Sequence, residues 1–115
     1  MDFFSIFCVS KAIVLDIDGT ITHKDRRLNL RAAETLRTLN IPVVLATGNI
    51  SCYAMAAAKL IGLNSYVKVE NVGLVFTGYD KPPTVSSNIE ECEKAFTFLS
   101  QHYKLTKLDP EYRKT

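Results

Sequence analysis

The chain has 115 residues, of which 47% are hydrophobic and 23% are charged, a balance typical of a globular domain that buries a core. Its formal net charge of +2 is too small to indicate a nucleic-acid-binding surface. No apolar stretch reaches the roughly 20 residues that a membrane-spanning helix needs, so we expect neither nucleic acid nor membrane as a partner.

The first residues and the cysteines suggest a cytoplasmic protein. Residues 1–10 are apolar, but they lack a positively charged start, and Asp2 has the wrong sign for a secretory signal. We expect these residues to form an N-terminal extension that lies outside the fold. Cys8, Cys52 and Cys92 form no C-x-x-C pair, which is typical of reduced thiols. The last two fall in helical patterns, and we expect them to be small core residues.

The most informative segment is a short apolar run followed by acidic residues. Residues 12–15 (AIVL) read as a central parallel strand, and residues 16–20 (DIDGT) follow directly, where a strand end opens onto a binding crevice. Gly19 allows the backbone to turn sharply away from the strand, and the Thr20 side chain is placed to brace the loop. An acidic turn after an edge strand is the ordinary structural alternative.

The spacing of the two carboxylates suits phosphoryl chemistry. At the end of a strand, Asp16 is placed to attack a phosphorus atom, and Asp18 is placed beside it to transfer a proton. Two carboxylates this close repel each other, so both stay ionised only with a cation between them. A hard cation with oxygen ligands, most plausibly Mg²⁺, meets that need.

Helical and strand patterns continue along the chain. Residues 21–27 are polar, and His23 and Lys24 in this segment belong either to a solvated turn or to a contact with an anionic substrate. Residues 29–39 carry apolar side chains at helical spacing, which predicts the crossover helix between two parallel strands. Pro42 then begins the second strand.

The second strand leads into another helix. Thr47 follows the strand, and Asn49 and Ser51 are candidates to cap a helix that runs to Ile61. Gly62 is placed to end that helix in a left-handed conformation. A phosphate held by Thr47 would therefore face a helix N-terminus.

The middle of the chain predicts buried packing and a hairpin. Tyr53 stands among alanines, and we expect it to pack against the sheet. Residues 66–69 and 73–76 read as two short strands, with a turn at residues 70–71, and residues 78–83 read as a loop. Glu70 and Asn71 in this turn either stabilise the turn or form hydrogen bonds to a substrate.

These motifs resemble the haloacid dehalogenase (HAD) superfamily of aspartate-nucleophile phosphatases, whose first motif is D-x-D-x-T/V after a strand. By this resemblance, Asp16 is the nucleophile and Asp18 the general acid and base. Thr47 looks like the second motif, and its hydroxyl would hold a phosphate oxygen together with the backbone N–H groups of Gly48 and Asn49. The fold so implied is α/β, with the Rossmann-like parallel sheet of a HAD core followed by the start of a mixed α/β cap.

Within the superfamily, the segments ATGN at residues 46–49 and ENVG at residues 70–73 look most like archaeal phosphoglycolate phosphatases, although Val72 stands where that subgroup has Gly. The resemblance implies Mg²⁺-dependent hydrolysis of a small phosphorylated metabolite, with 2-phosphoglycolate the leading candidate. Asp16 and the backbone carbonyl of Asp18 would ligate the metal.

The resemblance also divides the chain. It assigns residues 11–80 to the N-terminal half of the core and residues 81–115 to the beginning of the cap, where residues 87–90 (SNIE) match a capping box. The following helix carries an apolar stripe on one face, and such a stripe calls for a partner. The stripe consists of Ile89, Cys92, Phe96, Leu99 and Tyr103.

Members of this family are longer, and the Lys and G-D-x-x-x-D motifs that complete their active site have no counterpart here. The alternative function is therefore an inactive fragment or one half of a split enzyme, which acts as a phosphate-binding or subunit module. A complementing C-terminal half or a second copy of the chain would be its partner. A phosphotransferase or phosphomutase with the same aspartyl-phosphate is a further possibility.

Overall fold

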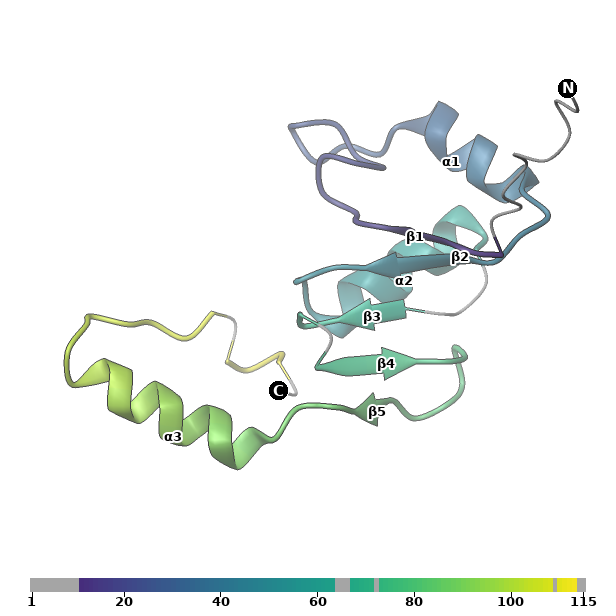
Figure 1. The fold of residues 1–115 in the computed structure, drawn as a ribbon. Coiled ribbons are helices and arrows are strands. Elements are labelled where there is room, and N and C mark those ends of the chain that lie inside the picture. The colour runs from purple at the N-terminus through teal and green to yellow at the C-terminus, as the bar shows by residue number, and fades with distance from the viewer. Residues whose placement is uncertain (1–10, 64–66, 72, 109, 114–115) are drawn as a thin grey trace, which may run out of the picture.

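A five-stranded sheet with helices packed on one face organises the chain (Figure 1). The computed structural model describes residues 11–63, 67–71, 73–108 and 110–113. The predicted extension at residues 1–10, which includes Cys8, lies outside these ranges. None of the helices described combines the length and the apolar character that crossing a bilayer requires.

The strands follow one another across the sheet in chain order: β1 (Ile13–Leu15), β2 (Val43–Ala46), β3 (Val67–Val69), β4 (Leu74–Phe76) and β5 (Thr84–Val85). Pairing is parallel from β1 to β3 and antiparallel from β3 to β5. Parallel neighbours need a crossover connection, and the helices α1 (Leu30–Thr38) and α2 (Ser51–Ile61) provide it. The predicted α/β fold is therefore confirmed, with an antiparallel extension at one side of the sheet.

β1 lies at the edge of the described sheet, so the prediction of a central strand is wrong for this chain. Its inner side pairs with β2, and Val14 is 60% exposed. A run of apolar residues predicts a strand buried on both faces, but it does not specify which strands lie beside it. Position within the sheet depends on the whole chain.

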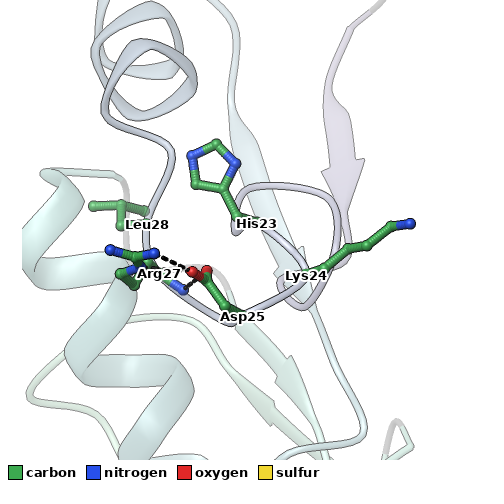
Figure 2. Close-up of a pocket in the computed structure, with 5 residues that line it drawn as sticks. All are labelled: His23, Lys24, Asp25, Arg27 and Leu28. Carbon is green, nitrogen blue, oxygen red and sulfur yellow. Dashed lines mark hydrogen bonds and ion pairs between the residues drawn. The ribbon is translucent and has the colours of Figure 1, made fainter.

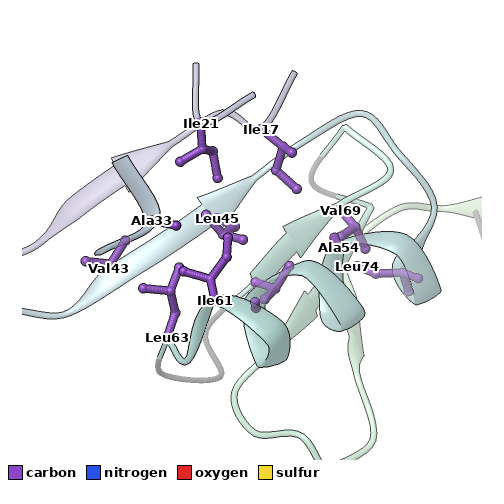
Figure 3. Close-up of a cluster of buried hydrophobic side chains, with 12 residues drawn as sticks. Ile17, Ile21, Ala33, Val43, Leu45, Ala54, Ile61, Leu63, Val69 and Leu74 are labelled. Atoms are coloured by element: carbon purple, nitrogen blue, oxygen red, sulfur yellow. The ribbon is translucent and has the colours of Figure 1, made fainter. Parts of the chain in front are cut away.

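The core lies between the helices and one face of the sheet (Figure 3). α1 (Leu30–Thr38) and α2 (Ser51–Ile61) both contribute buried residues to it. Side chains alternate along each strand, so every second strand residue faces the core and its neighbours face the other side. The buried hydrophobic residues are Ile17, Ile21, Ala33, Val43, Leu45, Ala54, Ala58, Ile61, Leu63, Val67, Val69 and Leu74.

Of the two caps predicted for α2, only the one at its C-terminus is confirmed. Gly62 ends α2 with φ 84°, a left-handed conformation that glycine adopts without strain, and this prediction is confirmed. The N-cap of α2 is Ile50, and no side chain caps it, so the capping prediction for Asn49 and Ser51 is wrong. By contrast, the Asn29 side chain caps α1.

A tight turn joins β3 and β4, as predicted. Glu70 and Asn71 both have positive φ, at 53° and 55°, and the Gly73 N–H donates to the Glu70 carbonyl at 3.0 Å. Left-handed backbone at residues other than glycine is uncommon and often marks a functional segment. Tyr66 and Val72, the other positions named for this hairpin, lie outside the described residues.

The final helix, α3 (Ile89–Ser100), contributes no buried residue. Its N-cap is Asn88, whose side chain accepts the Glu91 N–H at 3.2 Å, so the predicted capping box at residues 87–90 is wrong by one position. β5, a strand of two exposed residues before α3, was not predicted because so short a pattern carries no period.

The apolar stripe of α3 remains largely uncovered in the described structure: Ile89 is 48% and Leu99 43% exposed. Cys52 and Cys92 are exposed free thiols, so the prediction that they are core residues is wrong. Helical spacing identifies a face, but it does not show whether anything covers that face. The assignment of residues 81–115 to a cap remains a prediction.

Candidate functional site

The candidate site lies where β1 and β2 end side by side. Leu15 pairs with Leu45, so the residue after each strand reaches the same edge of the sheet. Asp16 is exposed at this edge, and its Oδ1 accepts the backbone N–H of Ile17 at 2.8 Å. This hydrogen bond fixes one oxygen of the carboxylate at the end of the strand.

A compact turn carries Asp18 past the strand end. The carbonyl of buried Ile17 accepts the backbone N–H groups of Thr20 and Thr22, both at 3.2 Å. Gly19 has φ 76°, and its N–H donates to Thr22 Oγ1 at 3.0 Å. The sharp turn expected at Gly19 is therefore present. The side chain that braces the loop belongs to buried Thr22, whereas Thr20, which we predicted for this role, is exposed.

Hydrogen bonds join Asp18 to the loop after β2. Asn49 Nδ2 donates to Asp18 Oδ2 at 2.7 Å and to Thr47 Oγ1 at 3.1 Å. The Asn49 backbone N–H also donates to Thr47 Oγ1, at 3.1 Å. Three of the predicted site residues thus form one cluster that spans two strand ends. Because the Asn49 side chain serves this cluster, it does not cap α2.

Tyr53, which was not predicted as a site residue, belongs to the site. Its hydroxyl lies 3.4 Å from Asp18 Oδ1, and the residue is 38% exposed, so the predicted packing against the sheet is wrong. Burial and the negative charge of Asp18 raise the pKa of the Tyr53 phenol, while Arg26 acts in the opposite direction. Tyr53 stands in the first turn of α2, directly after the loop that carries Thr47 and Asn49, and this position was the available signal.

The hairpin turn closes over the glycine of the loop. A Cβ atom at Gly48 would lie 2.8 Å from Asn71 Oδ1, so a side chain there would displace the asparagine. The backbone N–H of Glu70 donates to the Asn49 carbonyl at 3.1 Å, and Glu70 is buried. The turn is therefore tied to the same loop as the hydrogen-bonded cluster.

The segment before α1 forms an open hollow of about 630 Å³ (Figure 2). In it, Arg27 Nε donates to Asp25 Oδ2 at 2.6 Å, and this hydrogen bond is the main reason that the pKa of Asp25 lies below its usual value of 3.8. His23 and Lys24 are exposed beside this pair. Both interpretations of His23 and Lys24, a solvated turn or a contact with an anion, stay open.

The site offers some of the oxygen ligands that a hard cation needs. Asp16 and Asp18 supply carboxylates, while the described residues contain no group of three or more His, Cys, Asp or Glu side chains able to hold a metal ion. Mg²⁺ commonly binds one or two carboxylates together with water and substrate phosphate oxygens. The carboxylates of Asp16 and Asp18 therefore fit the ligands that a protein usually supplies to Mg²⁺.

Comparison with known proteins places these residues in a family. Residues 13–108 match the family model described as haloacid dehalogenase-like hydrolase. The chain is 63% identical over 105 residues to a phosphoglycolate phosphatase from Methanosarcina mazei, covering 91% of the chain and 46% of that protein. It is 53% identical over 105 residues to a phosphoglycolate phosphatase from Archaeoglobus fulgidus, covering 91% of the chain and 47% of that protein.

Solved structures show the same fold. The structure of Thermoplasma acidophilum 0175 has a TM-score of 0.75 at 25% identity, covering 90% of this chain and 47% of the other. A haloacid dehalogenase-like hydrolase from B. subtilis has a TM-score of 0.64 at 23% identity, covering 80% of this chain and 33% of the other, and it supports the fold alone.

The chain spans about half the length of the curated relatives it matches. The match nevertheless covers most of the chain itself, including the strand, loop and helix segments that carry the candidate site. The chain belongs to the haloacid dehalogenase-like hydrolase family.

Proposed function

We propose that the protein is a phosphatase that hydrolyses a small phosphomonoester with Mg²⁺, and that 2-phosphoglycolate is its substrate. One observation carries this proposal: the hydrogen-bonded cluster of Asp18, Asn49 and Thr47 lies at the strand end beside the exposed carboxylate of Asp16. The curated relatives named phosphoglycolate phosphatase support the choice of substrate. The free cysteines Cys52 and Cys92 are in keeping with the cytoplasmic location that we propose.

In the first step of the proposed reaction, Asp16 attacks the phosphorus atom in line with the leaving oxygen. The new bond between carboxylate oxygen and phosphorus forms as the bond to the substrate alcohol breaks, and Asp18 gives that alcohol its proton. In the second step, Asp18 takes a proton from water, whose oxygen attacks phosphorus and releases Asp16 and inorganic phosphate. Mg²⁺, held by Asp16 and the Asp18 carbonyl, would neutralise phosphate charge in both steps.

The cluster prepares Asp18 and Thr47 for these roles. Thr47 Oγ1 accepts hydrogen bonds from the backbone and the side chain of Asn49, which leaves its own O–H proton to donate to a phosphate oxygen. The Asn49 amide holds Asp18 Oδ2, so one carboxylate oxygen is fixed in position. The backbone N–H of Gly48 is a further donor in our proposal, since this residue bears no side chain.

The test is phosphate release from p-nitrophenyl phosphate and from 2-phosphoglycolate by the purified chain, with and without Mg²⁺. Turnover that needs Mg²⁺ and disappears in Asp16→Asn would support the proposal. Turnover that survives in Asp16→Asn would contradict the nucleophile. Turnover of p-nitrophenyl phosphate alone would contradict the substrate.

A second candidate function is that of a half-enzyme subunit. The outer edge of β1 pairs with no described strand, Val14 is 60% exposed, and the chain covers about half of its curated relatives. An exposed edge of a parallel sheet is a template for another strand. The partner would be a complementing C-terminal half or a second copy. Mixing the chain with a polypeptide that matches the remaining half of the Methanosarcina mazei relative should then create Mg²⁺-dependent turnover, and no gain would contradict this candidate.

A further inference from the structure

An arginine occupies a left-handed position in the turn between β1 and α1. The Arg26 N–H donates to the His23 carbonyl at 2.9 Å, and the His23 N–H donates to the Arg27 carbonyl at 2.8 Å, so these residues form a tight hairpin loop. Arg26 has φ 67°. Glycine or asparagine usually takes the left-handed position of such a loop, because other side chains strain the backbone there. Strain of this kind is often kept where a side chain has a functional role.

The charge of Arg26 is available to a ligand. The neighbouring Arg27 pairs with Asp25 at 2.6 Å, whereas Arg26 is exposed and forms no ion pair within the part of the chain that the structure describes. A planar guanidinium group can donate two parallel hydrogen bonds to the two oxygens of a carboxylate. Arg26 can therefore bind a carboxylate without first breaking another ion pair.

Arg26 lines a cleft of about 260 Å³ between this loop and α2. The walls of the cleft are mostly apolar and include the buried side chains of Ile17 and Ile21. Tyr53 lines the same cleft, and its hydroxyl lies 3.4 Å from Asp18 Oδ1. Burial has the largest effect on the pKa of the Tyr53 phenol and raises it, while the charge of Arg26 lowers it. The cleft therefore joins the charge of Arg26 to the side of Asp18 that Tyr53 contacts.

The proposed role of Asp18 indicates where the leaving group of the substrate lies. Asp18 gives its proton to the leaving oxygen, so this oxygen must come within hydrogen-bonding distance of the Asp18 carboxylate. The Asn49 amide donates to both Asp18 Oδ2 and Thr47, so Oδ2 is already engaged on the phosphate side. Asp18 Oδ1 faces Tyr53 instead. An alcohol whose oxygen meets Oδ1 would extend along the cleft toward Arg26.

We propose that Arg26 binds a carboxylate on the leaving group and thereby makes the site selective for phosphate esters of short hydroxy acids. This role rests on the proposed function of the site around Asp16 and Asp18. The two aspartates repel any second negative charge on the substrate, so a cation is needed on the side of the leaving group. The apolar walls of the cleft lower the local dielectric constant and strengthen the attraction between guanidinium and carboxylate.

The experiment compares two phosphonates that the site cannot hydrolyse, because a carbon atom replaces the bridging oxygen. In 3-phosphonopropionate the shape of 2-phosphoglycolate is kept, and propylphosphonate has a methyl group in place of the carboxylate. The full 115-residue chain is titrated with each in the presence of Mg²⁺, and the amide NMR signals of Gly48 and Asn49 report binding. A charge-assisted hydrogen bond predicts that the unchanged chain binds 3-phosphonopropionate about tenfold or more tightly than propylphosphonate.

Arg26→Met should remove this preference by weakening the binding of 3-phosphonopropionate alone, and Arg26→Lys, which keeps the charge, should keep part of it. Arg31→Met is the matched control, because Arg31 is exposed on α1 and does not line the cleft, so the preference should stay unchanged. Circular dichroism checks that each variant is folded.

An unchanged preference in Arg26→Met would overturn the role of Arg26, as would an equal loss of both ligands in that variant or a lost preference in Arg31→Met. The same samples are assayed for Mg²⁺-dependent turnover of p-nitrophenyl phosphate. Turnover by a chain that binds both phosphonates equally would support the proposed hydrolysis and overturn the role of Arg26. A preference that depends on Arg26 without turnover would support that role and contradict the hydrolysis, and a chain that binds neither phosphonate would overturn both.

Discussion

The Asn49 amide joins the two loops of the candidate site through its hydrogen bonds to Asp18 and Thr47. Substitutions of Asn49 should therefore show how much these hydrogen bonds contribute to the free energy of unfolding. In Asn49→Ala, Asp18 loses a donor at 2.7 Å. A hydrogen bond to a charged group contributes about 1.5–3 kcal/mol, so we expect a decrease of this size in the free energy of unfolding. Asn49→Asp removes the same donor and adds a second carboxylate beside Asp18.

Two unit charges about 4 Å apart repel by about 1 kcal/mol in water and about 4 kcal/mol at the effective dielectric constant of a protein surface. We therefore expect Asn49→Asp to be less stable than Asn49→Ala by an amount between these limits, and the difference should shrink in high salt. The measurement is urea-induced unfolding at pH 7, followed by circular dichroism, in low and high salt.

The matched control exchanges the two groups. In the double variant Asp18→Asn with Asn49→Asp, the amide and the carboxylate change places, and the hydrogen bond can form again with its direction reversed. This variant should be more stable than Asn49→Asp alone, as a double-mutant cycle requires for residues in contact. If Asn49→Asp proves as stable as Asn49→Ala, or if the exchange recovers nothing, the tether between the two loops does not exist as described.

Three further expectations test the fold around the site. Leu45→Ala removes a fully buried side chain from the middle of the parallel strands and should lower the free energy of unfolding by about 2–5 kcal/mol in urea titrations. Asn88→Ala should destabilise α3 by about 1 kcal/mol in thermal unfolding, whereas Ser87→Ala should change little, because Asn88 is the cap. Arg27 lowers the pKa of Asp25 below 3.8, so the stability from this pair is present above pH 3.8 and is lost as pH falls through the lower, folded-state value. NMR titration should find the Asp25 pKa back near 3.8 in Arg27→Met, and an unchanged pKa would contradict the contact.

Features that depend on neighbouring residues could be predicted from the sequence. The apolar run before Asp16 predicted a strand that ends in carboxylates, and a strand of that kind is present. Gly19 and Gly62 marked positions with positive φ, because glycine alone adopts that conformation without strain. The short motifs were enough to indicate the family, because the spacing of residues within one strand and the loop after it is set by neighbours along the chain.

Only the tertiary structure decided which distant groups meet. It placed β1 at the edge of the described sheet, made Thr22 the brace of the loop, and brought Tyr53 to Asp18 across 35 residues of sequence. It also placed Arg26 and Tyr53 in the same cleft. Strand order and register depend on how all the buried faces pack at once, so no single segment carries that information.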